Sequence, residues 1–141
     1  MHIERIEDCL TFLLGKAQQR AYQVGKLMLQ PYGVTPVQYA VLHLLWERDG
    51  QQSSELGERL RLDSATMTGL LDRLVQNGLV ERRSNSKDRR VNLIHLTNRG
   101  MELKDILNDK VEQAHQEVLK DFSEEEVALL KSFLSRIALS K

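Results

Sequence analysis

Hydrophobic residues recur every three or four positions over several stretches of the chain, which is the pattern of amphipathic helices. The first stretch, residues 3–29, predicts a long helix whose apolar stripe is interrupted only by Arg20. The segment PYGVTP then stops this helix, because a glycine and two prolines all oppose its continuation. Thr35 as N-cap and Pro36 at the first helical position predict a second helix. It is apolar almost all round to about Arg48, so we expect it to be buried.

Two shorter helical patterns joined by a tight turn follow in the middle of the chain. Ser53 is expected to cap the first, which has the sequence SELGERL, and Asp63 or Ser64 is expected to cap the second. The second runs to about Asn77, after which Gly78 supplies a left-handed residue. Two short helices connected in this way are typical of a helix-turn-helix.

The stretches LVERR and VNLIHL, on either side of the polar SNSKD, predict the two strands of a hairpin. Thr97 is then expected to cap a helix that continues to about Lys120. Ser123 and Glu126 form a capping box at the start of the last helix. The fold class expected from these elements is mainly α with a small β-hairpin wing.

The chain has 141 residues, which is most simply one domain, 1–141. Within it we expect a winged helix-turn-helix lobe over residues 35–100 and long dimerisation helices in residues 1–34 and 101–141. A lone cysteine cannot form an internal disulfide and is consistent with a reducing cytoplasm. No apolar run approaches the ~20 residues that span a membrane, and the N-terminal segment has no signal-peptide core.

The net charge is zero, with 20 basic and 20 acidic residues, but the charges are segregated. Residues 81–90 contain five basic side chains against two acidic ones, whereas residues 102–126 contain nine acidic side chains against three lysines. A solvated loop or a solvated helix explains either segment alone, but it explains their separation less well. The segregation indicates that one end of the protein meets an anion.

The pattern of residues 64–77 predicts a helix that buries Met67, Leu70, Leu71 and Leu74 and exposes small and hydroxylated residues on the opposite side. A glycine in mid-helix costs about 1 kcal/mol relative to alanine, so Gly69 requires a reason. A small exposed face fits the DNA major groove, where Ser and Thr reach base edges or phosphates and Arg pairs with guanine. A plain solvated face remains the alternative. The candidate DNA contacts of the lobe are Ser54, Ser64, Ala65, Thr66, Thr68, Gly69 and Arg73.

The hairpin loop carries Lys87, Arg89 and Arg90 and comes directly after the helix-turn-helix. An arginine in such a wing can enter the minor groove while its neighbours meet phosphates. DNA would repel Asp88, so we expect this carboxylate to hold the guanidinium of Arg90 in place. Solvation and protection of an edge strand are the alternative explanation for these charges.

Residues 53–100 resemble the winged helix-turn-helix of the multiple antibiotic resistance regulator (MarR) family. Asp88-x-Arg90, followed by the dipeptide LT and by Gly100, is similar to the wing signature of that family. The resemblance implies a homodimer held by the terminal helices. It also implies that helix 64–77 enters the major groove and that Arg90 enters the minor groove of an operator.

A dimer also follows from the hydrophobic pattern. Helices 3–29 and 123–139 each carry an apolar stripe that a lobe built from residues 36–97 cannot easily cover. Pairing with a second copy hides both stripes. It also sets two recognition helices about one DNA turn apart, which suits a pseudo-palindromic operator.

The signal that releases DNA is expected to be a small-molecule ligand, with a redox reaction at Cys9 as the alternative. The resemblance implies that small aromatic or acidic ligands bind between the dimer helices and the lobe, where Arg20, Tyr39 and His43 are the candidate contacts. A branch of the family senses organic hydroperoxides through a cysteine in the first helix. Cys9 stands two residues earlier than that cysteine, which on a helix is a rotation of about 200°. The acidic residues around it also disfavour a thiolate.

The four histidines and Cys9 are not spaced as metal ligands, so we expect no metal site. His43 lies on the second helix and is expected to be a hydrogen-bonded core residue. The sequence contains no nucleophile elbow or phosphate loop, so neither an enzyme nor a cofactor is expected. The sequence therefore predicts a DNA-binding transcriptional regulator, most simply a repressor. The alternative from another class is a winged-helix module that binds an acidic protein partner.

Overall fold

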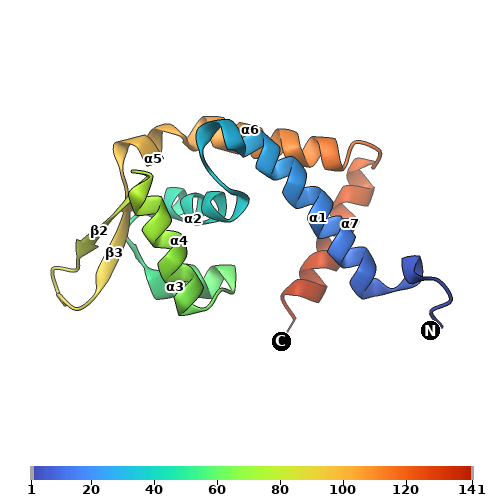
Figure 1. The fold of residues 1–141 in the computed structure, drawn as a ribbon, viewed down its shortest axis with the longest axis horizontal. Helices are drawn as coiled ribbons and strands as arrows, with labels where there is room; N and C mark the ends of the chain where they lie inside the picture. Colours follow the sequence, from blue (N-terminus) through green and yellow to red (C-terminus); the bar gives the residue numbers. More distant parts are fainter. Residues whose placement is uncertain (1, 141) are drawn as a thin grey trace.

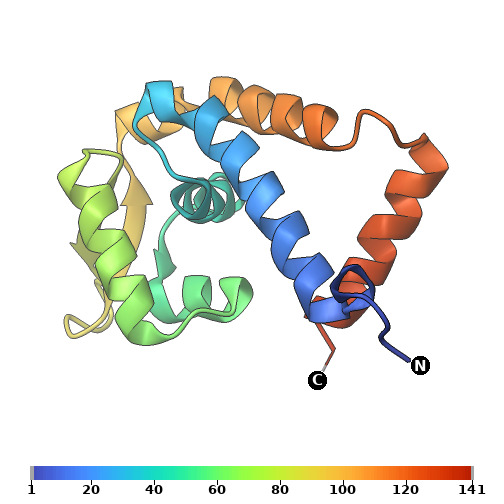
Figure 2. The same ribbon diagram turned by 45° about the vertical axis from the view of Figure 1, so that its right-hand side comes forward.

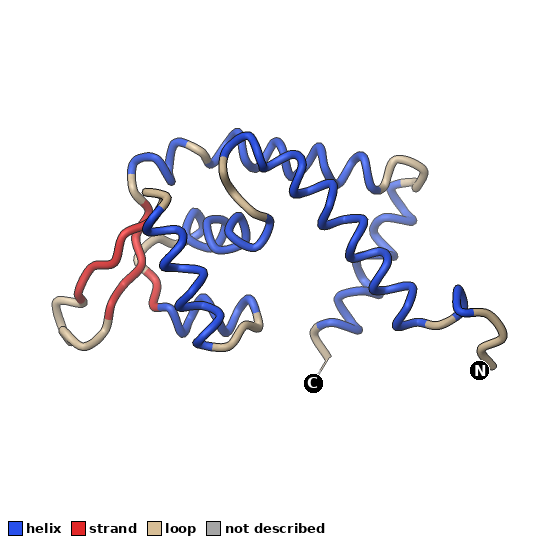
Figure 3. Tube along the Cα trace, viewed as in Figure 1, coloured by secondary structure: helices blue, strands red, loops and turns tan. Residues whose placement is uncertain are grey.

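The computed structural model describes residues 2–140 and consists mainly of helices around a small sheet (Figures 1 and 3). The elements in chain order are α1 (Leu10–Leu29), α2 (Pro36–Glu47), β1 (Gln51–Gln52), α3 (Ser53–Leu60), α4 (Ser64–Gln76), β2 (Val80–Ser84), β3 (Asn92–Leu96), α5 (Asn98–Glu102), α6 (Lys104–Val118) and α7 (Glu124–Ala138). Short 3-10 turns occupy Ile6–Asp8 and Gln30–Tyr32. None of the helices within residues 2–140 has the length and apolar character needed to cross a bilayer. The expected winged helix-turn-helix architecture is confirmed.

The elements are divided between a lobe and a limb, which we define here by their helices. The lobe contains α2, α3, α4, α5 and the sheet, and the limb contains α1, α6 and α7 (Figure 1). In the limb α1 packs along α6, whereas α7 turns back from the end of α6, so that the three helices form the sides of an open triangle (Figure 2). Both chain ends lie at the limb side of the molecule, away from the wing.

The core of the lobe is a single cluster of buried aliphatic residues centred on α2. Val41, Leu42 and Leu45 of α2 are at most 1% exposed, as the apolar character of this helix predicted. Leu29 at the end of α1 and Leu107 on α6 belong to the same cluster. The lobe and the base of the limb therefore share one core, and the position of α4 is tied to that of α6.

Side-chain caps start the helices where the sequence predicted them in four of five cases, and one of these is Thr97, which accepts the N–H of Gly100 at the start of α5. Thr35 and Ser123 each form a complete capping box, and Asp63 accepts the N–H of Thr66 at the start of α4. The expected cap at Ser53 is wrong. Gln52 has the extended N-cap conformation and exchanges hydrogen bonds with the residue three positions later, so Ser53 is already helical.

The long first helix does not begin at residue 3, and this expectation is corrected. Residues 6–8 form a 3-10 turn, Cys9 is extended (φ −79°, ψ 120°), and α1 begins at Leu10. No residue of the 6–8 turn is buried, so tertiary packing does not support a regular helix there. Similarly, the helix expected over 97–120 is divided into α5 and α6 at the buried Leu103.

The sheet has three antiparallel strands in the order β1-β3-β2. The predicted hairpin pairs Val80 with Leu96 and Arg82 with Ile94. Strand β1 was not expected, because two residues are too few to show the alternation of polar and apolar side chains that indicates a strand. It pairs with β3 and so ties the entry to α3 to the root of the wing.

The limb leaves many large apolar side chains exposed in the single chain. They lie on α1 and the segment before it, and on α7. Those more than 40% exposed include Ile3, Ile6, Leu10, Leu13 and Leu27, and Leu129, Phe133, Ile137 and Leu139. The stripes identified in the sequence are therefore not covered within residues 2–140.

Candidate nucleic-acid interface

Helix α4 is fixed in the lobe by its apolar face. Met67, Leu71 and Leu74 are at most 1% exposed and Leu70 is 8% exposed, which confirms the predicted inward side. The helix begins at Asp63, whose carboxylate accepts the N–H of Thr66 at 2.7 Å. This hydrogen bond lowers the pKa of Asp63, so the cap is ionised near neutral pH. Once these residues are buried, the rotation of α4 about its axis is determined.

The opposite face of α4 is exposed, and small side chains make up its first half. Ala65, Thr66, Gly69 and Arg73 all lie on the surface, as expected. A Cβ added at Gly69 would have no neighbour within 4 Å, so packing inside the chain does not require this glycine. Thr68 donates its hydroxyl to the carbonyl of Ser64 at 2.9 Å. The hydroxyl oxygen of Thr68 can therefore only accept a hydrogen bond from another group.

Asp72 lies on the same helix but is engaged with the wing. Its Oδ1 accepts a hydrogen bond from Nη2 of Arg82, on β2, at 2.7 Å. This contact joins the helix to the base of the hairpin and neutralises a carboxylate on the exposed side. Helical spacing alone places Asp72 on the exposed face of α4, but its partner Arg82 depends on how α4 packs against β2.

The tip of the wing contains the predicted contact between Asp88 and Arg90. The backbone N–H and the Nε of Arg90 donate to Asp88 Oδ1 at 3.1 and 3.2 Å, and Nη2 lies 3.4 Å from Oδ2. The Arg90 side chain nevertheless remains 91% exposed. These hydrogen bonds hold the pKa of Asp88 below its usual value, so the contact persists until the pH falls well into the acid range. The carboxylate restricts the guanidinium without hiding it.

The other wing cations differ in whether a carboxylate holds them. Among residues 2–140, Lys87 and Arg89 form no ion pair, so their charges are free to meet an external anion. The remaining wing arginines are paired as Arg82–Asp72, Arg83–Glu81 and Arg90–Asp88.

A shallow hollow of about 320 Å³ lies where the wing meets the helix-turn-helix. It brings Ser54 at the start of α3 and Thr68 on α4 together with Arg82 and Asn92 on the hairpin. Of these, the sequence named only the first two as candidate contacts. These four polar side chains extend the α4 surface toward the wing, above the aliphatic Leu71, Val91 and Ile94 that also line the hollow.

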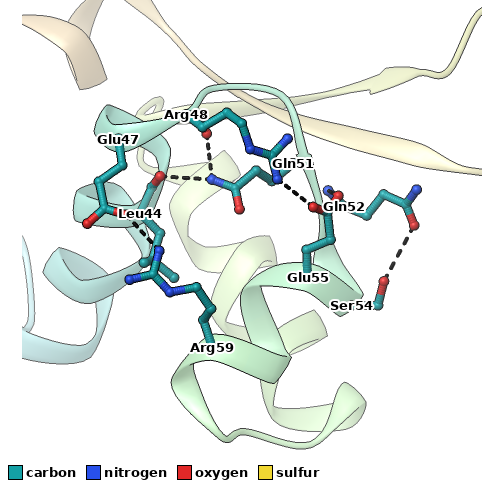
Figure 4. A network of polar contacts seen from close by, with 8 residues as sticks. All are labelled: Leu44, Glu47, Arg48, Gln51, Gln52, Ser54, Glu55 and Arg59. Carbon is teal, nitrogen blue, oxygen red and sulfur yellow. Dashed lines mark hydrogen bonds and ion pairs between the residues drawn. The ribbon is translucent and has the colours of Figure 1, made fainter.

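Helix α3 is positioned by a network of polar contacts with the end of α2 (Figure 4). Arg48 Nη2 lies 2.5 Å from Glu55 Oε2, and Arg59 Nη1 lies 2.6 Å from Glu47 Oε2. The buried amide of Gln51 donates to two carbonyl oxygens near the end of α2, at 2.8 and 2.5 Å. The hydrogen bond from Arg59 lowers the pKa of Glu47, so this carboxylate is charged across the neutral range.

The three candidate ligand residues do not all lie together. Tyr39 donates its hydroxyl to Asn108 Oδ1 on α6 at 2.7 Å and lies 3.3 Å from His43 Nδ1. Burial raises the pKa of Tyr39, so its phenol stays protonated. Arg20 Nη2 instead lies 3.9 Å from Glu117 Oε1. Glu117 is nine residues beyond Asn108 on α6, which separates the two positions by about 14 Å along the helix axis.

The expectation that His43 is a core residue is wrong. Its side chain is 46% exposed, and Nε2 lies 3.5 Å from Glu47 Oε1. The apolar pattern of α2 concealed this, because the histidine occupies the one side of the helix that the core does not cover. Tyr39 and Trp46, beside it, are half-buried and pack against the core cluster.

Cys9 is half-buried and forms the N-cap position of α1. Because it precedes the helix, the 200° rotation expected from helical spacing does not apply to it. Among residues 2–140, no group of three or more His, Cys, Asp or Glu side chains is arranged to hold a metal ion.

Comparisons with known proteins agree with this geometry. The sequence profile described as "MarR family" matches residues 34–91. The organic hydroperoxide resistance transcriptional regulator of Bacillus subtilis is 38% identical over 101 residues, which are 72% of this chain and 69% of the relative.

Two solved structures are similar over nearly the whole chain. A mutant MarR from Escherichia coli in complex with operator DNA is 31% identical, with a TM-score of 0.85 and coverage of 91% of this chain and 92% of the other. CouR from Rhodococcus jostii RHA1 bound to p-coumaroyl-CoA is 28% identical, with a TM-score of 0.85 and coverage of 99% and 98%. Sequence, fold and the arrangement of helix and wing thus agree, and the chain belongs to the MarR family of transcriptional regulators.

Proposed function

We propose that this protein represses transcription by binding a pseudo-palindromic operator as a homodimer, and that a small effector releases it. The observation that carries the proposal is the exposed small-residue face of α4 beside a wing whose Arg90 is held by Asp88. In Figure 1 the wing loop and the start of α4 lie on the same lower side of the lobe. One DNA duplex can therefore meet both.

In the proposed complex α4 enters the major groove and the wing follows the adjacent minor groove. Thr66 and Arg73 are placed to contact base edges, and Gly69 lets the helix backbone approach the groove floor. Arg90 meets the negative potential of the minor groove. Lys87 and Arg89, whose charges are not paired within residues 2–140, contact phosphates and contribute affinity for any sequence.

The homodimer proposal is supported by the exposed apolar side chains of the limb. Leu10 and Leu13 of α1 and Phe133 and Ile137 of α7 are each more than 45% exposed, and they come from the two ends of the chain. A patch of this kind marks an association surface. A second copy would cover both stripes with one isologous interface and would place two α4 helices on one face.

The effector proposal rests on the junction between limb and lobe. The hydrogen bond from Tyr39 to Asn108 crosses this junction, and the exposed His43 lies beside it. A ligand bound there could favour one spacing of the two lobes over another. The structurally similar CouR was solved with p-coumaroyl-CoA, which supports an aromatic or acidic ligand for this chain also. Arg20 lies farther along the limb and is proposed as a contact only for a long ligand.

The DNA-binding proposal is tested with a duplex from upstream of the protein's own gene. An electrophoretic shift that exceeds the shift of an unrelated duplex, and that weakens with salt, supports it. The rival proposal, a module for an acidic protein partner, predicts equal and weak shifts with both duplexes.

Substitution of the wing residues tests the minor-groove contact. Arg90→Ala should weaken operator binding by about 1–3 kcal/mol, because it removes a specific groove contact. Asp88→Ala should also weaken binding, although it removes a negative charge, because Arg90 is then no longer held. Affinity is measured by fluorescence anisotropy. Glu81→Gln, which removes an equivalent charge next to Arg83, is the control; tighter binding by Asp88→Ala would contradict the positioning role.

The substitution Gly69→Ala separates stability from DNA binding. It should raise the free energy of unfolding by up to about 1 kcal/mol, because the added methyl group meets open space and alanine favours a helix. The same change should weaken operator binding, and Gly69→Leu should weaken it further, because each side chain holds the backbone away from the groove. Thermal unfolding and anisotropy measure the two effects. Unchanged affinity in Gly69→Leu would show that α4 does not approach DNA closely.

The double variant Leu13→Glu/Phe133→Glu tests the dimer interface. Wild type should sediment with twice the 16.2 kDa chain mass, while the variant should sediment as a monomer or aggregate, since buried carboxylates oppose association. Met101→Glu, at an exposed apolar residue of α5, should leave the dimer intact. A wild-type protein that binds its operator as a 16.2 kDa monomer would exclude the proposed dimer.

Comparison of Cys9→Ser with wild type distinguishes a ligand from a redox signal. We expect an organic peroxide at low concentration to release neither protein from the operator, because Cys9 stands two residues before the position of the sensing cysteine in the peroxide-sensing branch of the family. Release is followed by anisotropy. If wild type is released and Cys9→Ser is not, the redox alternative is correct, in line with the hydroperoxide regulator among the relatives.

A further inference from the structure

The turn between α3 and α4 contains a residue in an unusual conformation. Arg61 has φ 59° and ψ 41°, which is the left-handed region that side chains with a Cβ disfavour. The other positive-φ residues within 2–140 are Gly33, Gly50 and Gly78. At each of these turns glycine removes the steric cost, whereas the helix-turn-helix turn carries an arginine.

The turn itself does not need the Arg61 side chain. Backbone groups complete the end of α3: the N–H of Arg61 donates to the carbonyls of Glu58 and Gly57, and the N–H of Leu62 donates to Gly57 at 2.9 Å. Glycine would make the same hydrogen bonds without strain. The reason for an arginine at this position therefore lies in its side chain.

The guanidinium of Arg61 is available to an external anion. The residue is exposed and forms no ion pair among residues 2–140. By contrast Arg59, two positions earlier, is held by Glu47 at 2.6 Å, and Arg48 is held by Glu55. Among residues 2–140, Arg61 on the turn and Arg73 on α4 thus both lack a carboxylate partner.

The location of Arg61 indicates which anion it meets. It lies two residues before Asp63, the N-cap of α4, so its charge adds to the positive end of that helix. Asp63 opposes it only in part, because its carboxylate is engaged with the N–H of Thr66. In Figures 1 and 2 the α3–α4 connection lies at the lower edge of the lobe, on the side toward which the wing loop also extends.

We propose that Arg61 binds a DNA backbone phosphate, as an anchor at the opposite end of α4 from the wing's base. This inference rests on the proposed function, since it requires a duplex across α4 and the wing. The wing and Arg61 would then hold DNA on both sides of the recognition helix. The strained backbone at Arg61 is tolerated because only a long cationic side chain reaches the phosphate from this turn.

The test uses the full-length protein and compares Arg61→Gly, Arg61→Asn and Arg61→Lys with wild type. Gly and Asn tolerate the left-handed conformation and carry no charge, so both should raise the melting temperature by about 2 °C or more. Both should also weaken binding to an arbitrary duplex by roughly tenfold at 0.1 M salt. The slope of log affinity against log salt should become shallower by about 1.8 for a dimer that loses two phosphate contacts.

The remaining variants provide the controls. Arg61→Lys should keep the wild-type salt slope. Arg99→Gln, which removes one exposed charge from α5 at the opposite end of the lobe, should leave the slope nearly unchanged. The phosphate contact is excluded if Arg61→Gly raises the melting temperature but keeps the affinity and the salt slope of wild type. It is also excluded if Arg61→Lys reduces the salt slope as much as Arg61→Gly does. If wild type itself shows no salt-dependent binding to any duplex, the proposed function fails together with it.

Discussion

The burial of one face of α4 in the lobe core is the constraint on which the rest of the structure depends. Met67, Leu71 and Leu74 are at most 1% exposed, and burying each of these side chains stabilises the fold by roughly 1.5–3 kcal/mol. Because a helix is rigid, fixing these residues also fixes the opposite face. The exposed positions of Ala65 and Gly69 are thus a consequence of core packing.

Polar contacts then set the neighbouring elements relative to this helix. Gln51 and the ion pairs of Glu47 and Glu55 hold α3, and the contact of Asp72 with Arg82 holds the base of the wing. Exposed ion pairs of this kind contribute little to the free energy of unfolding. Their effect is to restrict orientation, which matters when two elements must meet one rigid ligand at the same time.

Although the net charge of the chain is zero, two of its segments carry local charge of opposite sign. Basic residues are in excess on the wing, over residues 81–90, and acidic residues are in excess over residues 102–126, which include α6 and the start of α7. At physiological salt, charges separated by more than about 8 Å are largely screened, so the limb does not cancel the local attraction of the wing for an anion. The limb instead leaves apolar side chains exposed, and a hydrogen bond from Tyr39 on α2 to Asn108 on α6 joins it to the lobe.

The sequence by itself determined the features that depend on residues within about four positions of one another. The caps at Thr35, Asp63 and Ser123, the inward face of α4 and the contact of Asp88 with Arg90 are of this kind, since helix and turn geometry bring residues at such short spacing together. Only the tertiary structure decided what depends on packing between elements. The contact of Asp72 with Arg82, the two-residue strand β1, the exposed side of α2 at His43 and the start of α1 at Leu10 belong to this second group. A local sequence pattern does not specify which helices and strands will pack together. Burial and the contacts between elements therefore become known only when the core is assembled.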